Sequence, residues 1–233
     1  MASIPESKVS PERLMQFGSP IRRRRSLVQR WRFRYAAWRT KIARRHQSRN
    51  RSLGAWFACH NAKDEVRVLD LAAGSGIWEL RSQKSPRVQV TAVDWSGMVP
   101  STKRITQKFD VGDRFKFSEG DLLEADFGNG YDITTLGHIL HSEGEERSRK
   151  LLKKTAPALK SGGTIAIGEW LVNDERTEPL NGLMFAVNML VNTERGDTFS
   201  FNEIRRWLEE AGFKNARTLE TPGPSPLLLA TKP

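Results

Sequence analysis

The chain has 233 residues, of which 38% are hydrophobic, and it carries a formal net charge of +11. This length favours one domain that buries a substantial core. The single cysteine, Cys59, excludes an internal disulfide and a multi-cysteine zinc site. No apolar run approaches the roughly 20 residues that span a bilayer, and the N-terminus lacks the apolar segment of a signal peptide. We therefore expect a cytoplasmic protein with no transmembrane segment.

The positive charge is concentrated at the N-terminus. Residues 1–53 hold 15 Lys/Arg and two acids, whereas the rest of the chain holds 23 Lys/Arg and 25 acids. The first segment therefore carries +13 and the remainder −2. Such an asymmetry marks a boundary between an appendage and a globular body. We predict a basic arm over residues 1–53 and one domain over residues 54–233.

Within the arm, residues 21–51 are rich in arginine, and apolar residues recur every three to four positions at Leu27, Trp31, Tyr35, Trp38 and Ile42. This period predicts an amphipathic basic helix, although arginines also alternate with aromatics around Phe33 as in a strand. Four roles are open: binding nucleic acid, binding an anionic membrane surface, targeting an organelle, or packing the apolar stripe on the body. Packing is favoured because charge runs are usually solvated faces.

Residues 66–76 predict a buried strand that enters a glycine-rich turn and then a helix. Gly74 and Gly76 would let the backbone approach a ligand where a Cβ would collide. The dinucleotide pattern G-x-G-x-x-G fails, because Glu79 occupies the third glycine position. Asp70 at the strand end would repel a pyrophosphate and attract an ammonium group. A cationic nucleoside such as S-adenosylmethionine therefore suits this turn better.

Two further acids end the next predicted strands. Asp94 closes residues 88–94, where its carboxylate would accept both hydroxyls of a ribose. Asp121 closes residues 115–121, where its carboxylate would accept an adenine amino group. Three acids at predicted strand ends thus match three groups of S-adenosylmethionine: its ammonium, its ribose and its adenine.

Residues 68–76, Asp94, residues 120–121 and residues 138–141 together resemble the class I S-adenosylmethionine-dependent methyltransferases. Within that class the chain is most similar to the O-methyltransferases that act on small phenolic and polyketide-like hydroxyls. The resemblance covers about residues 64–233. It implies a Rossmann-like α/β fold, with a mostly parallel seven-stranded sheet and helices on both faces, preceded here by the basic helical arm. The larger N-terminal domain that forms the family's dimer is missing from this sequence, so a homodimer is an open expectation.

The resemblance also implies a cofactor site for S-adenosylmethionine, with S-adenosylhomocysteine as product and no metal. Its expected residues are Asp70, Ala72, Gly74, Gly76, Asp94, Trp95, Asp121 and Leu122. Ala72 occupies the first glycine of the family pattern D-x-G-x-G-x-G, a departure that a small residue tolerates.

Beyond Asp94 the pattern predicts helices and strands in alternation. We expect a helix over 99–110, a strand over 131–136, a helix from the S-x-x-E capping box at Ser142 to about 159, and a strand over 163–169. A second capping box at Ser200 predicts a helix to about 211, and an edge hairpin is expected over 213–219 and 227–231.

His141 is the candidate catalytic base. A phenol is a poor nucleophile at neutral pH, so O-methyl transfer needs a group that removes its proton, and histidine is suited to that task. By resemblance His141 falls on the family's catalytic histidine, and Glu169 on the first of two acids beside it. The second acid would fall near Thr198, with Asp197 next to it, and is left unassigned. Glu169 would orient the imidazole and stabilise its cation. The alternatives are that His141 caps the helix and that Glu169 is a surface charge.

The acceptor pocket is assigned to five residues: His138, Met184, Phe185, Asn188 and Met189. Met and Phe often line aromatic pockets, although an apolar stretch such as 180–191 is more often a core helix. The two histidines, three residues apart, do not by themselves make a metal site, and we predict no metal.

The sequence therefore predicts an enzyme that transfers a methyl group from S-adenosylmethionine to a hydroxyl of a small aromatic or polyketide-like molecule. The alternative is a nucleic-acid-associated methyltransferase or cofactor-binding module that uses residues 21–51 to bind RNA or another anionic surface.

Overall fold

The computed structural model describes residues 65–76, 87–220 and 225–233. The predicted arm, its amphipathic helix over 21–51 and the boundary at residue 53 lie outside the described residues, as does the helix expected after Gly76. The nucleic-acid and membrane interpretations of the arm therefore stay predictions.

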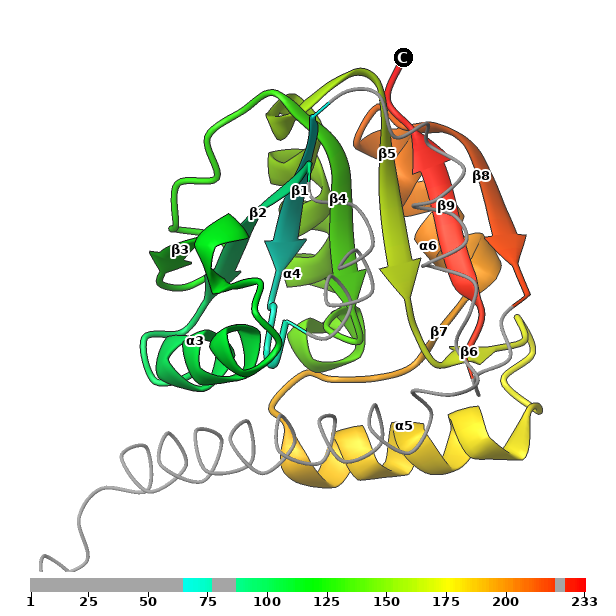
Figure 1. The fold of residues 1–233 in the computed structure, drawn as a ribbon. Helices are drawn as coiled ribbons and strands as arrows, with labels where there is room; N and C mark the ends of the chain where they lie inside the picture. The colour runs from blue at the N-terminus through cyan, green and yellow to red at the C-terminus, as the bar shows by residue number, and fades with distance from the viewer. Residues whose placement is uncertain (1–64, 77–86, 221–224) are drawn as a thin grey trace, which may run out of the picture.

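The described residues form a seven-stranded sheet, as predicted (Figure 1). Its order is β3-β2-β1-β4-β5-β9-β8, and the five strands from β3 to β5 are parallel. The strands are β1 (Val66–Leu71), β2 (Val88–Asp94), β3 (Phe115–Glu119), β4 (Tyr131–Gly137), β5 (Leu159–Gly168), β8 (Lys214–Leu219) and β9 (Leu227–Thr231). A separate pair joins β6 (Leu171–Val172) to β7 (Phe199–Ser200). The expected edge hairpin is confirmed, because β8 and β9 are antiparallel.

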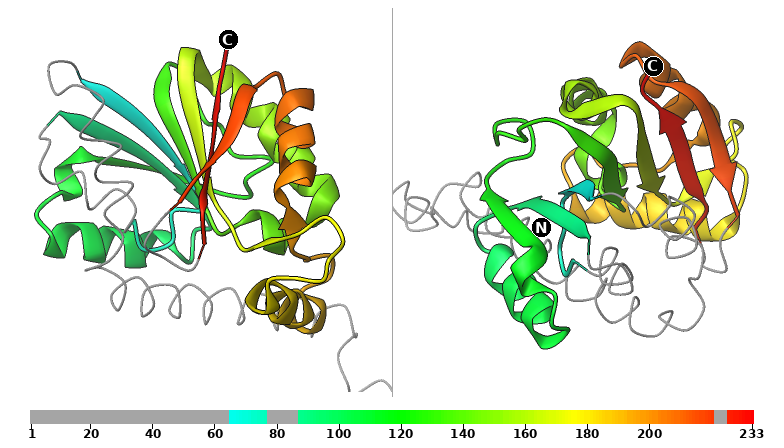
Figure 2. Two further views of the ribbon diagram at one scale, coloured as in Figure 1. Left: turned by 90° about the vertical axis from the view of Figure 1, so that its right-hand side faces the viewer. Right: turned by 45° about the horizontal axis from the view of Figure 1, so that its top comes forward.

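Helices cover both faces of the sheet. They are α3 (Val99–Lys108), α4 (Leu140–Thr155), α5 (Leu180–Asn192) and α6 (Phe201–Glu210), with short 3₁₀ turns at Gly112–Arg114 and Ala156–Ala158. Side chains alternate along β1, so Val68 joins a core beneath α3 while Leu69 joins a larger core beneath α4 and α6. In Figure 1, α5 crosses below the ends of the strands, and Figure 2 shows the same placement from the side.

The helix expected from Ser142 to about 159 is wrong at both ends. It begins at Leu140 and ends at Thr155, and β5 already starts at Leu159. The capping box is absent, because the Ser142 hydroxyl donates to the Ile139 carbonyl and Gly144 has a φ of 74° that interrupts the first turn. The same motif at Ser200 is confirmed: Ser200 accepts from the Glu203 amide, and the Glu203 carboxylate accepts from the Ser200 amide.

Among the helices described, none combines the length and the hydropathy that a membrane span requires.

Candidate active site

Parallel strands bring the predicted acids to one edge of the sheet. Asp70 on β1 pairs in register with Ala92 on β2, two residues before Asp94. β1 also lies beside β4, and β4 beside β5, so Glu169 follows directly on the same edge. Because β2 and β4 flank β1 on opposite sides, the order in which successive strands are added to the sheet reverses here, and open α/β sheets bind ligands in the crevice at such a point.

The glycine-rich turn is held from below by β2 and α3. The Gly74 amide donates to Asp94 Oδ2 at 2.7 Å, and the Thr102 hydroxyl donates to the Gly74 carbonyl at 2.5 Å. A Cβ at Gly76 would lie 3.3 Å from methyl groups of Thr102 and Thr106. This glycine therefore packs closely on α3, and our expectation that it also makes room for a ligand stays a prediction.

Ala72 adopts a backbone conformation that normally favours glycine. Its φ is 58°, in the left-handed region that costs an L-residue roughly 1–2 kcal/mol. The glycine of the family pattern thus has a conformational reason, and this chain retains the conformation without that residue.

The two strand-end acids are buried and hydrogen-bonded. Asp94 accepts from the amides of Gly74 and Trp95, each at 2.7 Å, and Asp70 Oδ1 accepts from the Thr135 hydroxyl at 3.0 Å. Each carboxylate oxygen can accept more than one hydrogen bond, so these contacts leave capacity for a ligand. Trp95 itself is 38% exposed at this edge.

Asp121 and Leu122 have different surroundings from those expected. Arg147 on α4 donates to both carboxylate oxygens of Asp121 at 2.8 Å, while Leu122 is buried in the core beneath that helix. The carboxylate predicted to receive an adenine amino group is therefore already in an ion pair.

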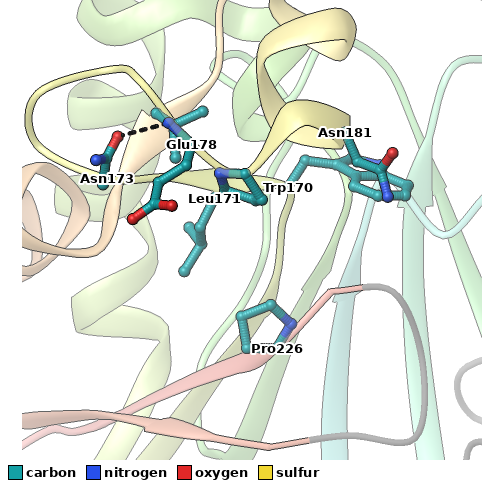
Figure 3. Close-up of a pocket in the computed structure, with 8 residues that line it drawn as sticks. Trp170, Leu171, Asn173, Glu178, Asn181 and Pro226 are labelled. Carbon is teal, nitrogen blue, oxygen red and sulfur yellow. Dashed lines mark hydrogen bonds between the residues drawn. The ribbon is translucent and has the colours of Figure 1, made fainter.

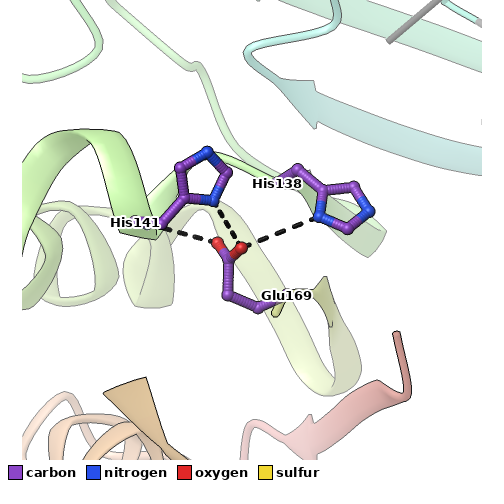
Figure 4. A group of neighbouring side chains, drawn as sticks. All are labelled: His138, His141 and Glu169. Atoms are coloured by element: carbon purple, nitrogen blue, oxygen red, sulfur yellow. Dashed lines mark hydrogen bonds and ion pairs between the residues drawn. The ribbon is translucent and has the colours of Figure 1, made fainter. Parts of the chain in front are cut away.

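His141 and Glu169 form a fully buried pair (Figure 4). His141 Nδ1 lies 2.5 Å from Glu169 Oε1, and the His141 amide donates to Oε2 at 3.3 Å. Both side chains have no exposed surface. The predicted contact is present, so Glu169 is no surface charge.

The two histidines keep Glu169 ionised. Burial works to raise the pKa of the Glu169 carboxyl, but the imidazoles of His141 and His138 outweigh it and hold that pKa well below its ordinary value. An ionised carboxylate only accepts, so Nδ1 of His141 carries the hydrogen of the 2.5 Å bond. The tautomer fixed in this way leaves Nε2 as the basic nitrogen.

His138 is also directed at Glu169, which the sequence did not indicate. Its Nδ1 lies 3.7 Å from the same oxygen, Oε1, and its ring is partly exposed and 6.1 Å from the ring of Trp170. Figure 4 shows both imidazoles facing one carboxylate. Trp170, whose amide donates to Oε1 at 3.0 Å, was missed as well; its position next to Glu169 was the available signal.

The structure divides the other residues assigned to the acceptor pocket. Phe185 meets the His141 ring edge to face at 4.8 Å, and Met189 is buried one turn further along the same side of α5. Met184 is 60% exposed, and Asn188 is exposed with it on the outer side of the helix. The structure therefore does not bring Met184 and Asn188 to His141 with Phe185, because the two pairs lie about 100° apart around the helix. That Met184 and Asn188 line the acceptor pocket stays a prediction.

The loop after α5 fixes the backbone of His141. The Asp197 amide donates to the His141 carbonyl at 2.9 Å. A Cβ at Gly196 would lie 2.5 Å from that same carbonyl, and a Cβ at Gly144 would overlap the carbonyl oxygen of Arg195. Thr198, where the family would have its second acid, is buried in this loop. Two glycines distant in sequence thus permit the close approach that positions His141.

A depression of about 430 Å³ borders the histidine cluster (Figure 3). Its lining residues are Trp170, Leu171, Val172, Asn173, Glu178, Pro179, Asn181 and Pro226. The ring of Trp170 lies 5.5 Å from that of Phe185, so this aromatic residue belongs to both the depression and the surroundings of His141.

His138, His141 and Glu169 offer one ligand atom each, all within 4.8 Å of one another. The geometry favours a hydrogen-bonded cluster over a metal centre. Two ligands of one tetrahedral zinc ion are about 3.3 Å apart, whereas Nδ1 of His141 and Oε1 of Glu169 are 2.5 Å apart, the distance of a short hydrogen bond.

A family model described as an O-methyltransferase domain matches residues 61–214. The chain belongs to this O-methyltransferase family. Among curated proteins it is similar to the tetracenomycin polyketide synthesis 8-O-methyl transferase TcmO of Streptomyces glaucescens, with 28% identity over 64% of this chain and 43% of TcmO.

Solved O-methyltransferase structures share the fold. An O-methyltransferase family 2 protein of Planctomyces limnophilus in complex with apigenin superposes with a TM-score of 0.67 and 26% identity, over 72% of this chain and 51% of that one. The structure of PigF with SAH superposes with a TM-score of 0.66 and 26% identity, over 71% of this chain and 50% of PigF. The chain thus spans about half the length of these relatives.

Proposed function

We propose that the chain transfers a methyl group from S-adenosylmethionine to a hydroxyl of a small aromatic or polyketide-like molecule. The observation that carries the proposal is the buried hydrogen bond between His141 and Glu169, at the strand ends of an O-methyltransferase fold. TcmO, a relative named for polyketide synthesis, and the apigenin complex of another relative support this class of acceptor.

In this mechanism His141 Nε2 accepts the hydroxyl proton as the acceptor oxygen attacks. When bound, S-adenosylmethionine would supply an electrophilic methyl group on a sulfonium; the acceptor oxygen would take that methyl group, and the S–C bonding electrons would remain on S-adenosylhomocysteine as the product. The imidazolium that results is stabilised by the Glu169 carboxylate beside it, in a site that excludes water and so strengthens the interaction. Proton removal by a positioned base contributes about 10²–10⁴-fold.

The residues present fit the cofactor. The hydrogen-bonded Asp94 carboxylate would accept the ribose hydroxyls, and Asp70 would attract the ammonium group. The remaining expected contacts to the cofactor would come from the backbone of Ala72 and Gly74 and from the ring of Trp95. An adenine contact from Asp121 would require the acid to accept from the base while it pairs with Arg147.

Calorimetric titration of the full chain with S-adenosylmethionine and S-adenosylhomocysteine tests the cofactor. We expect micromolar binding, weakened roughly 10- to 100-fold by Asp94→Ala, because hydrogen bonds to a charged group are lost. Glu124→Ala, which removes an exposed acid, is the matched control and should bind normally. If a folded chain bound neither compound, the proposal would fail.

A chelator should leave the activity unchanged. The Nδ1 hydrogen of His141 already occupies Glu169. We therefore expect the same rate of methyl transfer from the untreated enzyme and from enzyme treated with EDTA and then dialysed. Rates measured before and after treatment, with metal content determined by mass spectrometry, check this. A loss in EDTA that Zn²⁺ or Mg²⁺ restores would contradict it.

We propose that the binding partner is the small-molecule methyl acceptor, and that the protein acts in the cytoplasm. A homodimer and a contact between residues 21–51 and nucleic acid stay predictions.

A further inference from the structure

Helix α5 carries an apolar outer face that nothing in residues 65–76, 87–220 and 225–233 covers. Five large side chains on it, Leu180, Met184, Val187, Leu190 and Val191, are 54–77% exposed. All but Leu190 fall within about 60° of one another around the helix, and Leu190 lies beside Val187. No charged residue occurs in the thirteen residues of α5. Contiguous apolar surface of this kind marks a site of interaction.

The inner side of the same helix is pressed onto the body. Phe185 and Met189 are buried there, and a Cβ at Gly182 would lie 2.6 Å from the Leu171 carbonyl. The orientation of α5 is therefore fixed by close packing, so the apolar residues of the outer face cannot turn inward.

Both ends of this face are acidic. The flanking segments, residues 173–179 and 193–197, contain five acids and two arginines. Arg176 is paired with Asp197 and Glu203, and Arg195 with Glu146. Glu175, Glu178 and Glu194 are exposed and form no ion pair in the part of the chain that the structure describes.

This charge pattern distinguishes three possible binding partners of the outer face: an anionic bilayer, a second copy of the chain, and a basic segment. An anionic bilayer would be repelled by the acids at both ends. A second copy docked through a two-fold axis would bring acids together in either arrangement. If the two α5 helices ran in opposite directions, Glu178 of one copy would lie near Glu194 of the other, and if they ran in the same direction, each acidic end would meet its own equivalent. A basic partner with an apolar stripe meets neither objection.

Residues 21–51 of this chain have both properties. They contain 13 Lys/Arg and no acid. Leu27, Trp31, Tyr35, Trp38 and Ile42 fall within about 80° on a helix, a stripe roughly 22 Å long beside the roughly 20 Å of α5. The 13 residues between Arg51 and Glu65 leave 14 Cα–Cα steps, which can extend to about 48 Å and allow the segment to reach the helix.

We propose that residues 21–51 dock as a helix on the outer face of α5, with Trp31 and Trp38 against the apolar side chains and arginines beside Glu178 and Glu194. The proposal concerns an interaction within the chain and does not depend on methyl transfer.

Hydrogen exchange of the full chain tests it, followed by mass spectrometry of the peptides covering 180–192. We expect Trp31→Asp/Trp38→Asp to raise their exchange rate about tenfold, because an undocked helix opens more readily. Phe33→Asp is the matched control, since it removes an aromatic from the opposite side of the predicted helix; exchange in α5 should then stay as in the unmodified chain. The peptide of α6 serves as an internal reference.

The reverse pair, Met184→Asp/Val191→Asp, should raise exchange across residues 21–51 equally, while Asn181→Asp leaves it unchanged. Unaltered α5 exchange in Trp31→Asp/Trp38→Asp would overturn the proposal. Protection of α5 that falls on dilution would assign the face to a second copy, and protection gained only with phosphatidylserine vesicles would assign it to a membrane; either result also overturns it.

Discussion

Replacing His141 with glutamine is expected to lower kcat by about 10²–10⁴-fold and to leave the affinity for S-adenosylmethionine within about twofold. Glutamine keeps a side-chain N–H that can donate to Glu169, so the buried carboxylate keeps a partner. It has no basic nitrogen, so the acceptor hydroxyl retains its proton. Single-turnover rates with saturating cofactor, beside calorimetric binding, measure the two effects separately.

Glu169→Gln provides the matched comparison. It preserves an acceptor for the Nδ1 hydrogen of His141 but removes the charge that stabilises the imidazolium. The lowered pKa of Glu169 keeps the native carboxylate ionised across pH 5–9, so the acid limb of the native rate profile does not report Glu169. In Glu169→Gln we expect kcat to fall, but by less than in His141→Gln, because the base itself is retained. A His141→Gln enzyme of native rate would exclude His141 as the base.

The sequence indicated the strand-end acids well because parallel strands impose a rule. Asp70, Asp94 and Glu169 each end an apolar run, and carboxyl ends of parallel strands meet at one edge. The contact between Glu169 and His141 follows from the same rule, since β4 and β5 are neighbours.

Local motifs were less reliable where tertiary contacts compete. The S-x-x-E pattern occurs at both Ser142 and Ser200, but it forms a capping box only at Ser200. At Ser142 the glycine two residues on takes a left-handed conformation to pass the Arg195 carbonyl, 51 positions away. No window of sequence around Ser142 contains that contact.

The sequence pattern also could not predict which side of α5 faces the body of the protein. Residues 180–192 are apolar almost all round, so period alone could not separate Phe185 from Met184. Close packing of Gly182 on Leu171 turns Phe185 toward His141 and leaves Met184 outside. His138, which approaches Glu169, likewise has a φ of 56°, and this backbone conformation cannot be predicted from a histidine in the sequence.

Gly144→Ala should be the most destabilising single-methyl substitution near the site. The residue has a φ of 74°, and an added Cβ would overlap the Arg195 carbonyl oxygen, which is backbone and cannot rotate away. We expect a loss of roughly 2–5 kcal/mol in the free energy of unfolding, which combines left-handed strain with overpacking, and a melting temperature lower by roughly 5–15 °C. Thermal denaturation followed by circular dichroism measures this.

Gly162→Ala is the control that separates the two destabilising effects expected in Gly144→Ala, the left-handed backbone strain and the overlap with the Arg195 carbonyl. Its φ is 77°, but no atom lies within 4 Å of the position of the added Cβ, so only the left-handed strain of about 1–2 kcal/mol remains. The difference between the two variants is then the cost of displacing the loop over 193–198 from α4. Because that loop donates to the His141 carbonyl through Asp197, Gly144→Ala should also lower kcat at temperatures where it is folded, whereas Gly162→Ala should not. Equal melting temperatures for the two would mean that the loop yields freely and does not position His141.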